Sequence, residues 1–340
     1  MSRAVHPDTT SRTSTTPLTP ATASTRMKAL TVPAMLAIGG FVSVQSLING
    51  QLAAGLGTGL RAGALAAVIS FGSGLVLLTA WVLLHRPSGR RLRGLYRGVR
   101  AGDVPLRLLL GGLFGAAFVA SQGLATGLLG VALFIVCFVA GQSVTALLVD
   151  HFGWGPSGRT AISLPRLFGS VLAVVAAVLS GVQVGLSSTS VTPALVLTAA
   201  LPLLAGAGTS IQQGLNGRVA VHAGPWPTTW NNFLVGTAGL LVFLALSFLA
   251  PGELVGLPGQ WWLYLGGLFG IAFISLSTVM VRIHGVLVLG LWAVAGQVVA
   301  AVVIDLVVAP EELGPLSWVA AGLTLVGVLG AMTLRARGVR

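Results

Sequence analysis

Residues 110–118 read Leu110-Gly-Gly-Leu-Phe-Gly-Ala-Ala-Phe118, and residues 265–273 read Leu265-Gly-Gly-Leu-Phe-Gly-Ile-Ala-Phe273. From Leu110 to Asp150 the first copy aligns with the second without a gap, and 17 of these 41 positions are identical. Each copy is preceded by the phrase Gln-x-x-x-Asn-Gly, which begins at Gln45 in the first half and at Gln212 in the second. Shared apolar composition alone does not produce this agreement, so the chain contains an internal repeat.

The composition predicts a membrane protein. Of the 340 residues, 55% are hydrophobic and 8% are charged, and the mean hydropathy is +0.94. So little polar surface does not cover a water-soluble globule of this size. Stretches of about 20 apolar residues, long enough to cross the hydrocarbon core, recur along the chain. We predict ten membrane-spanning helices, at 32–54, 62–84, 106–124, 127–149, 164–184, 193–215, 228–249, 260–280, 283–306 and 316–334.

The basic residues predict the orientation of these helices. With the N-terminus in the cytoplasm, 18 of the 19 Lys and Arg residues lie on the cytoplasmic side, and Arg61 lies on the other. The positive-inside rule therefore places both termini in the cytoplasm. The net charge of +12 is assigned to an inner face that contacts anionic lipids, and not to nucleic-acid binding.

Each repeat contains five predicted helices. An odd number of crossings makes the second copy enter the membrane from the opposite face, so the repeats are predicted to be inverted. The fold class is therefore an all-α polytopic membrane protein with ten transmembrane helices in two inverted five-helix repeats. The predicted divisions are a Ser/Thr/Pro-rich disordered cytoplasmic tail, a first repeat and a second repeat, at 1–30, 31–185 and 193–336.

These features resemble the drug/metabolite transporter (DMT) superfamily, and within it the EamA-like YdcZ branch of inner-membrane exporters. The resemblance rests on the five-plus-five helix pattern, the paired Gln-x-x-x-Asn-Gly phrases and the repeated Leu-Gly-Gly-Leu-Phe-Gly stretch, over roughly residues 30–336. It implies a bacterial inner-membrane carrier of a small molecule, with helices 1–4 and 6–9 around a central cavity and helices 5 and 10 at the periphery. It implies no particular substrate.

Four amide side chains are the main candidate substrate-binding residues. Gln45 and Asn49 are four residues apart and share one helix face, and Gln212 and Asn216 repeat this arrangement. An amide facing lipid leaves its hydrogen-bonding groups unsatisfied, so these faces are expected to point into the protein. They line the substrate path or join helices by hydrogen bonds. The sequence leaves both interpretations open.

Further candidates lie in the second repeat and at the repeated motifs. Asn231, Asn232 and Trp292 are candidate substrate contacts, with N-capping as the alternative for the two asparagines and a lipid-facing position as that for the tryptophan. Residues expected mainly in helix packing, or at the cavity wall, are Gln142, Gln297, Gly111, Gly115, Gly266 and Gly270.

Acidic groups are scarce in the predicted spans. Asp150 and Asp305 lie at equivalent helix ends and are candidates for coupling or gating, with a helix-end ion pair as the alternative. The five histidines have no mid-helix carboxylate partner, and Cys137 is the single cysteine. The sequence therefore predicts no enzyme, cofactor or metal site. A non-transporting scaffold or sensor is the alternative function, and a homodimer is left open.

Overall fold

The computed structural model describes residues 31–156, 158–159, 161–187, 193–308, 310 and 314–336. The predicted tail at 1–30 lies outside these residues. So do the side chains of residues 165–166, 180–187, 193–195, 281–288 and 331–336.

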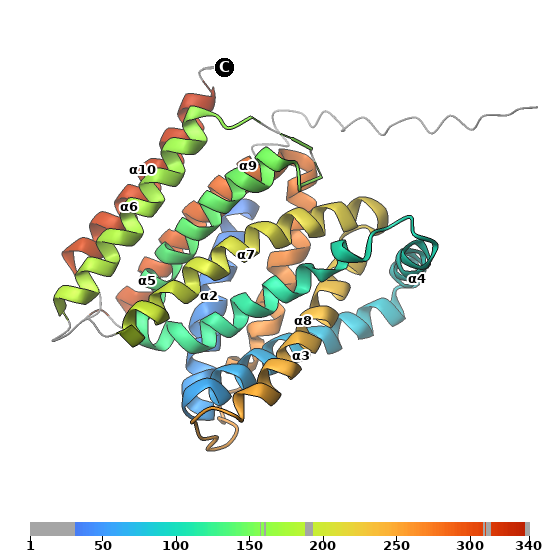
Figure 1. Cartoon of the computed structure of the whole chain (residues 1–340), viewed down its shortest axis with the longest axis horizontal. Coiled ribbons are helices and arrows are strands. Elements are labelled where there is room, and N and C mark those ends of the chain that lie inside the picture. The colour runs from blue at the N-terminus through green and yellow to red at the C-terminus, as the bar shows by residue number, and fades with distance from the viewer. Residues whose placement is uncertain are drawn as a thin grey trace, which may run out of the picture.

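The described residues form helices and no strand (Figure 1). Their bounds are α2 Val32–Leu56, α3 Gly59–Leu84, α4 Arg86–Ala101, η1 Leu106–Leu110, α5 Gly111–Phe152, α6 Leu164–Ser187, α7 Pro193–Ala223, α8 Pro225–Ser247, η2 Trp261–Leu265, α9 Gly266–Val308 and α10 Pro315–Ala336. Six described segments are long and apolar enough to cross a membrane, namely Val32–Leu56, Gly59–Leu84, Leu106–Phe152, Pro225–Ser247, Trp261–Met280 and Leu289–Val308. The fold is that of a polytopic membrane protein.

The long helix α5 is broken at Gly130, where φ is 72° and ψ is 164°. A glycine is needed here because other residues rarely adopt a positive φ. A straight helix of 42 residues would extend about 63 Å, roughly twice the hydrocarbon thickness. The break separates α5 into two arms that match the predicted spans 106–124 and 127–149. Helix α9 is likewise assigned as helical through its predicted turn, between 280 and 283.

Helices from opposite halves of the chain cross with their backbones in contact. A Cβ on Gly206 of α7 would overlap the carbonyl of Phe138 in α5. At the equivalent crossing, a Cβ on Gly39 of α2 would overlap the carbonyl of Ala293 in α9. Only glycine fits these two positions, because the opposing atoms belong to the backbone and do not rotate away.

Equivalent hydrogen bonds also join the two halves of the chain at these crossings. The hydroxyl of Ser43 in α2 donates to the carbonyl of Gln297 in α9 at 2.7 Å. The hydroxyl of Ser210 in α7 donates to the carbonyl of Gln142 in α5, also at 2.7 Å. Ser43 and Ser210 are equivalent in the repeat, as are Gln142 and Gln297. Each half of the chain therefore contacts the other through the same pair of surfaces.

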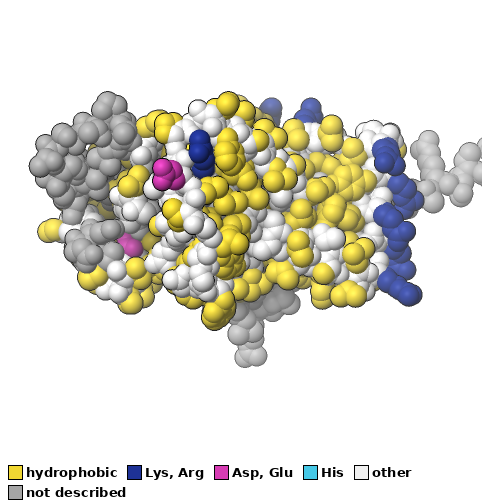
Figure 2. Space-filling model, turned by 90° about the horizontal axis from the view of Figure 1, so that it is seen from below, with side chains coloured by type: hydrophobic (Ala, Val, Ile, Leu, Met, Phe, Trp, Pro, Cys, Tyr) yellow, Lys and Arg dark blue, Asp and Glu magenta, His cyan; other side chains and the backbone are white. Residues whose placement is uncertain are grey.

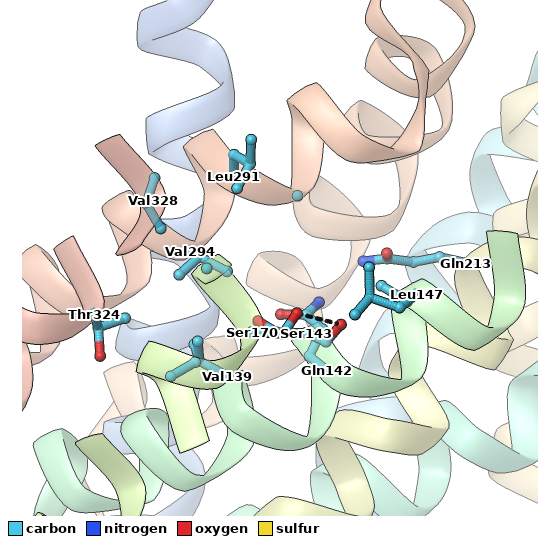
Figure 3. A pocket seen from close by; sticks show the side chains of 14 residues that line it. Val139, Gln142, Ser143, Leu147, Ser170, Gln213, Leu291, Val294, Thr324 and Val328 are labelled. Carbon is cyan, nitrogen blue, oxygen red and sulfur yellow. Dashed lines mark hydrogen bonds between the residues drawn. The ribbon is translucent and has the colours of Figure 1, made fainter. Parts of the chain in front are cut away.

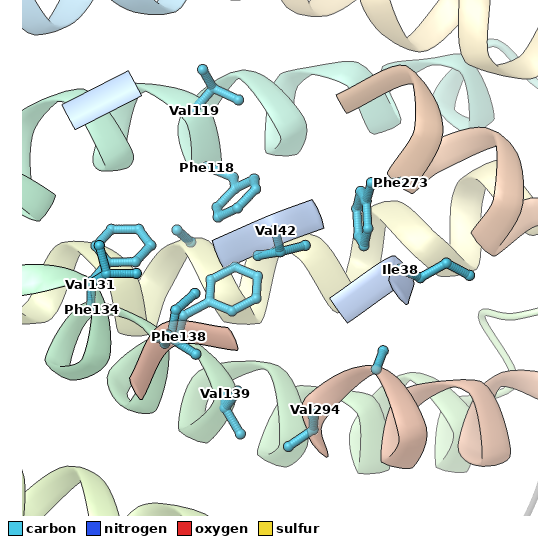
Figure 4. Close-up of a cluster of buried hydrophobic side chains, with 14 of the residues drawn as sticks. Ile38, Val42, Phe118, Val119, Val131, Phe134, Phe138, Val139, Phe273 and Val294 are labelled. Carbon is cyan, nitrogen blue, oxygen red and sulfur yellow. The ribbon is translucent and has the colours of Figure 1, made fainter. Parts of the chain in front are cut away.

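Aromatic and branched side chains fill the space between these crossings (Figure 4). Phe134 and Phe138 of the second α5 arm are fully buried, and the ring of Phe118 on the first arm lies 4.7 Å from that of Phe138. The two arms of α5 thus pack against each other across the break. This core keeps the first arm of α5 beside α7, where the candidate site lies.

The amphipathic helix α4 lies between the predicted spans 62–84 and 106–124, and it was not predicted from the sequence. Its six arginines are all exposed, whereas Ser88 and Leu95 are buried. Basic side chains gather at the end of the molecule where α4 lies (Figure 2). A helix with one basic and one apolar face is suited to a membrane surface.

Candidate functional site: two amide clusters and an apolar cavity

The first group of buried amides, here named the α2 cluster, contains Gln45, Ser46, Asn49, Ser70 and Gln122. Gln45 donates to the carbonyl of Gly266 in α9 at 2.9 Å. Asn49 donates to Oε1 of Gln122 in α5 at 2.7 Å, and Gln122 donates to Ser46 at 2.9 Å. All five side chains are buried. The cluster therefore ties α2 to α5 and α9 by amide hydrogen bonds.

The second group, the α7 cluster, contains the equivalent residues Gln212, Gln213, Asn216, Asn232 and Ser277. Gln212 and Asn216 both donate to Oδ1 of Asn232 in α8, each at 2.9 Å. Asn232 is fully buried. One asparagine therefore accepts from both members of the Gln-x-x-x-Asn pair. The sequence predicts that these amides face inward, and their burial agrees with that prediction.

The repeated glycines lie directly opposite these amides. A Cβ on Gly115 of α5 would lie 2.5 Å from Nε2 of Gln212, and a Cβ on Gly111 would lie 2.7 Å from Oδ1 of Asn216. In α9, a Cβ on Gly270 would lie 2.8 Å from Nε2 of Gln45, and Gly266 faces Asn49 in the same way. The two motifs of the repeat thus interlock, with the glycines of each half making room for the amides of the other.

A stacked aromatic pair lies between the clusters. The rings of Phe71 in α3 and Phe233 in α8 are 4.7 Å apart with an interplanar angle of 27°. Phe71 approaches Gly115, and Phe233 approaches Gly270. Phe71 and Phe233 occupy equivalent positions, each one residue after a cluster member, Ser70 or Asn232. The pair therefore joins the two halves of the chain beside both clusters.

Asn231 connects the site to the surface helix α4. Its Nδ2 donates to the carbonyl of Leu109 at 2.9 Å, and its Oδ1 accepts from the hydroxyl of Tyr96 at 2.8 Å. Burial raises the pKa of Tyr96, which keeps the donating phenol protonated. Because α8 begins at Pro225, Asn231 and Asn232 lie beyond its first turn and are not N-caps.

A large cavity in the described part of the chain has a volume of about 1330 Å³. It lies between α2, α3, the first arm of α5, α7 and α8, and it reaches Thr58 in the α2–α3 turn and Pro251 after α8. None of the candidate amide side chains lines it in this structure. Gly50 and Ile211 do, and they are the sequence neighbours of Asn49 and Gln212. Each cluster therefore contains a residue that is adjacent in sequence to a residue of the cavity wall.

Two smaller cavities contact polar residues. One of about 20 Å³ is lined by Gln212, Asn216 and Ser277 of the α7 cluster. The other, of about 70 Å³, is lined by Gln142 and Gln213 and by residues of α6, α9 and α10 (Figure 3). Oε1 of Gln142 has no hydrogen-bond partner, and neither amide atom of the equivalent Gln297 has one.

Asp305 holds the break in α5. Its carboxylate accepts hydrogen bonds from the backbone N–H groups of Val131, at 3.2 Å, and Ala132, at 2.6 Å. These groups begin the second arm of α5 after Gly130, so Asp305 caps a helix N-terminus and complements its dipole. Within the described residues this cap, and not an ion pair, is the contact that Asp305 makes. Asp150 is buried and also has an interaction partner.

Two arginines each bind the backbone of the other half. Arg61 at the start of α3 donates to the carbonyls of Gly252 at 2.7 Å, Ala250 at 3.1 Å and Phe248 at 3.2 Å. Arg218 near the end of α7 donates to the carbonyl of Gly153 at 2.7 Å. The contacts lie at opposite ends of their helices. The sequence singles out Arg61 by its sidedness, but nothing in it indicates these acceptors.

The remaining candidates are placed as follows. Trp292 is partly buried and packs against the main apolar core, and it does not line the cavity of about 1330 Å³. Sequence reasoning missed Gln122, Ser277 and Tyr96. Gln122 and Ser277 are equivalent in the repeat, and a comparison of polar positions between the copies would have found them. No group of three or more His, Cys, Asp or Glu residues with metal-binding geometry occurs in the described residues.

Comparison with known proteins identifies the family. The family model described as "Putative inner membrane exporter, YdcZ" matches residues 30–179 and 197–330, which together cover most of the chain in two repeats. No curated protein matches. A solved structure described as "Crystal structure of protein" superposes with a TM-score of 0.52 and 17% sequence identity, over 93% of this chain and all of the other. At this identity the likeness shows a shared fold.

Proposed function

The chain belongs to the YdcZ family of inner-membrane exporters, and on this premise we propose that it exports a small solute by alternating access between its two repeats. The family supports a multi-pass inner-membrane location and a transporter role. The observation that carries the mechanism is the reciprocal contact of equivalent residues, such as Ser43 with Gln297 and Ser210 with Gln142. Two similar units that pack in this way have exchangeable conformations, which is the basis of alternating access.

In the proposed topology the chain crosses the membrane ten times, with both arms of α5 and two parts of α9 counted separately, and both termini lie in the cytoplasm. The exposed arginines of α4 support this orientation because they follow the second crossing. Arg61 and the α2–α3 turn then lie on the outer side. The cavity of about 1330 Å³ reaches this turn, so it extends towards the outer side in this proposal.

We assign gating roles to the two arginine contacts. Arg61 joins α3 to the segment after α8 beside the cavity, whereas Arg218 joins α7 to the turn after α5. Because they lie at opposite ends of the proposed bundle, a rocking motion strains one contact while preserving the other. Charge-assisted hydrogen bonds to carbonyls are strong enough to hold a closed end and weak enough to break in each cycle.

The amide clusters form the floor of the proposed solute path. Asn49 and Gln212 are the sequence neighbours of the cavity residues Gly50 and Ile211. Oδ1 of Asn49 and Nδ2 of Asn232 have no partner in this conformation, which leaves hydrogen-bonding capacity for a solute once the repeats move. Asp150 and Asp305 remain the candidates for coupling, since they lie at the helix ends that such motion displaces.

The first experiment measures counterflow in proteoliposomes with a panel of radiolabelled metabolites and drugs. The sharper arm uses the variant Thr58→Cys with Glu253→Cys, because the backbone N of Thr58 lies 2.9 Å from the carbonyl oxygen of Glu253. Oxidation of this pair is expected to stop counterflow, and reduction to restore it, with each single cysteine variant as control. Full flux in the oxidised protein would contradict alternating access. Absence of flux for every solute would favour the scaffold or sensor role.

The panel also identifies whether the amides contact the solute. A transported compound is expected to raise the melting temperature of the wild type, and to raise it less in Asn49→Ala and Asn216→Ala. Undiminished stabilisation in both variants would move the contact elsewhere, towards Asn231 and Trp292.

A further inference from the structure

The walls of the large cavity restrict the chemistry of what it holds. None of its lining side chains is charged, and none is an amide. Its polar side chains are the hydroxyls of Thr58, Ser121 and Thr198. A solute that enters this space loses water and finds few groups to replace it, so charge and strong polarity are penalised.

The hydroxyls are already engaged within the chain. Ser121 donates to the carbonyl of Phe118 at 2.6 Å, and Thr58 accepts from the backbone N–H of Glu253 at 3.3 Å. Thr198 also has an interaction partner. The side chains of the cavity therefore present apolar surface and space, created by the many glycine and alanine residues in its wall.

The open side of the cavity is equally apolar. Leu113 and Leu128 of α5 and Leu197 and Leu204 of α7 line it and are exposed. In the proposed topology these leucines belong to membrane-spanning segments, so the exposed edge borders the hydrocarbon core. A molecule dissolved in the bilayer reaches the cavity along this edge without crossing a polar barrier.

From the unengaged apolar lining and this lipid-facing edge we infer that the cavity binds an uncharged, largely apolar small molecule taken from the membrane. This inference rests on the proposed transport function and specifies the substrate class. Amino acids, sugar phosphates and other ionised metabolites are excluded from the class, because the cavity holds no counter-charge.

The test compares two fluorescent probes that share one aromatic skeleton. N-phenylnaphthylamine is uncharged, and anilinonaphthalene sulfonate carries one negative charge. Binding is measured in nanodiscs of fixed lipid composition, where partition into lipid is common to all variants. We expect the uncharged probe to bind wild type about tenfold more tightly than the sulfonate.

Substitutions that fill the cavity test whether the probe binds there. A Cβ on Gly127 meets no atom within 4 Å, and Gly127 lines the cavity, so Gly127→Phe is expected to place its ring in this space. A second variant, Ala117→Leu, fills the same cavity from another turn of α5. The matched control is Gly322→Phe in α10, where a Cβ also meets nothing within 4 Å and which does not line this cavity. Melting temperatures confirm that each variant is folded.

Both filling variants are expected to weaken binding of the uncharged probe about tenfold, and Gly322→Phe to leave it unchanged. Equal binding by wild type and both filled variants would overturn the inference. So would equal affinity for the sulfonate with the same sensitivity to filling. Lipid that copurifies with wild type and is lost from the filled variants, without a change in probe binding, would identify an acyl chain as the occupant and also overturn it.

Failure of the proposed transport function can be distinguished from failure of this inference about the substrate class. If the uncharged probe binds at the cavity but no apolar solute shows counterflow, the binding site stands and the carrier role does not. If an ionised solute shows counterflow that oxidation of the cysteine pair blocks, the carrier role stands and the substrate class is wrong.

Discussion

The α2 and α7 clusters contain the same Gln-x-x-x-Asn pair, but the hydrogen-bond partners of the two amides differ between the clusters. In the α7 cluster the third residue is Asn232, which accepts from both amides. In the α2 cluster the equivalent residue is Ser70, whose hydroxyl has no partner. There Asn49 instead bonds Gln122, whose equivalent in the second repeat is the short Ser277.

The helix that supplies the long amide partner thus differs between the two repeats. The first repeat has a short residue on α3 and a long one on α5, whereas the second has a long one on α8 and a short one on α9. The small cavity beside Ser277 lies in the α7 cluster, where the short side chain leaves space. The equivalent backbones of the two repeats therefore place a polar contact at the same position. The side chains determine which neighbouring helix provides the hydrogen-bond partner.

The largest expected effect is a loss of stability when the glycine opposite either cluster is replaced. A Cβ on Gly112 would overlap the carbonyl of Asn232, and a Cβ on Gly267 would overlap the carbonyl of Ser70. We expect Gly112→Leu and Gly267→Leu each to destabilise the protein by about 3 kcal/mol or more, because two helices must separate. Thermal unfolding in detergent measures the effect. Gly72→Leu is the control, since its Cβ meets nothing, and unchanged melting temperatures in the first two variants would refute the helix contact.

The next prediction separates the clusters. Asn232→Leu removes the acceptor of Gln212 and Asn216 and is expected to cost about 1–3 kcal/mol, since two buried amides lose their partner. Ser70→Ala at the equivalent position is expected to change stability by less than about 0.5 kcal/mol, because its hydroxyl has no partner to lose. Equal losses in the two variants, measured by chemical denaturation, would mean that the clusters do not differ.

A double-mutant cycle sharpens the comparison further. Asn49→Ala and Gln122→Ala are expected to show a coupling free energy of about 0.6–1.7 kcal/mol, since the two side chains share a hydrogen bond. The matched cycle of Asn216→Ala and Ser277→Ala is expected to give a coupling below about 0.5 kcal/mol, because no bond joins them. Similar coupling in both cycles would show that the partner exchange does not matter energetically.

The smallest expected effect concerns the two arginines. Arg61→Gln loses contacts to three carbonyls and is expected to cost about 1 kcal/mol, whereas Arg218→Gln is expected to cost less. Under the gating proposal, thiol accessibility of Ala117→Cys should rise in Arg61→Gln and not in Arg218→Gln. An identical accessibility in all three proteins would argue against a gate at Arg61.

Much of the fold is predictable from sequence because the membrane simplifies the physics. Apolar stretches must be helical in hydrocarbon, and the predicted spans match α2, α3, α6, α7, α8 and α10 within a few residues, except that α7 continues to Ala223. The α4 helix escaped prediction because its stability comes from the partition of its two faces and not from apolar length. The finer ten-helix inverted arrangement remains a proposal.

The site was predictable in part. Burial of the paired amides follows from the cost of exposing an amide to lipid. Their partners do not follow, because Gln122 lies 73 positions from Asn49 and is brought there by helix packing. For the same reason the sequence does not reveal that Asp305 caps the second arm of α5, or that the large cavity is lined by residues adjacent in sequence to the amides and not by the amides themselves.

The position of α4 also bears on how the chain is made. Its arginines follow directly on the first helical hairpin, α2 and α3, so they leave the ribosome before any of α5. If they are retained on the cytoplasmic side, as the positive-inside rule requires, the orientation of the hairpin is decided during synthesis and before the second repeat exists. The second repeat has a much weaker charge signal of its own and is oriented by the number of crossings that precede it. An insertion error in the first repeat would therefore change the orientation of all later helices, whereas an error in the second repeat would leave the orientation of the first unchanged.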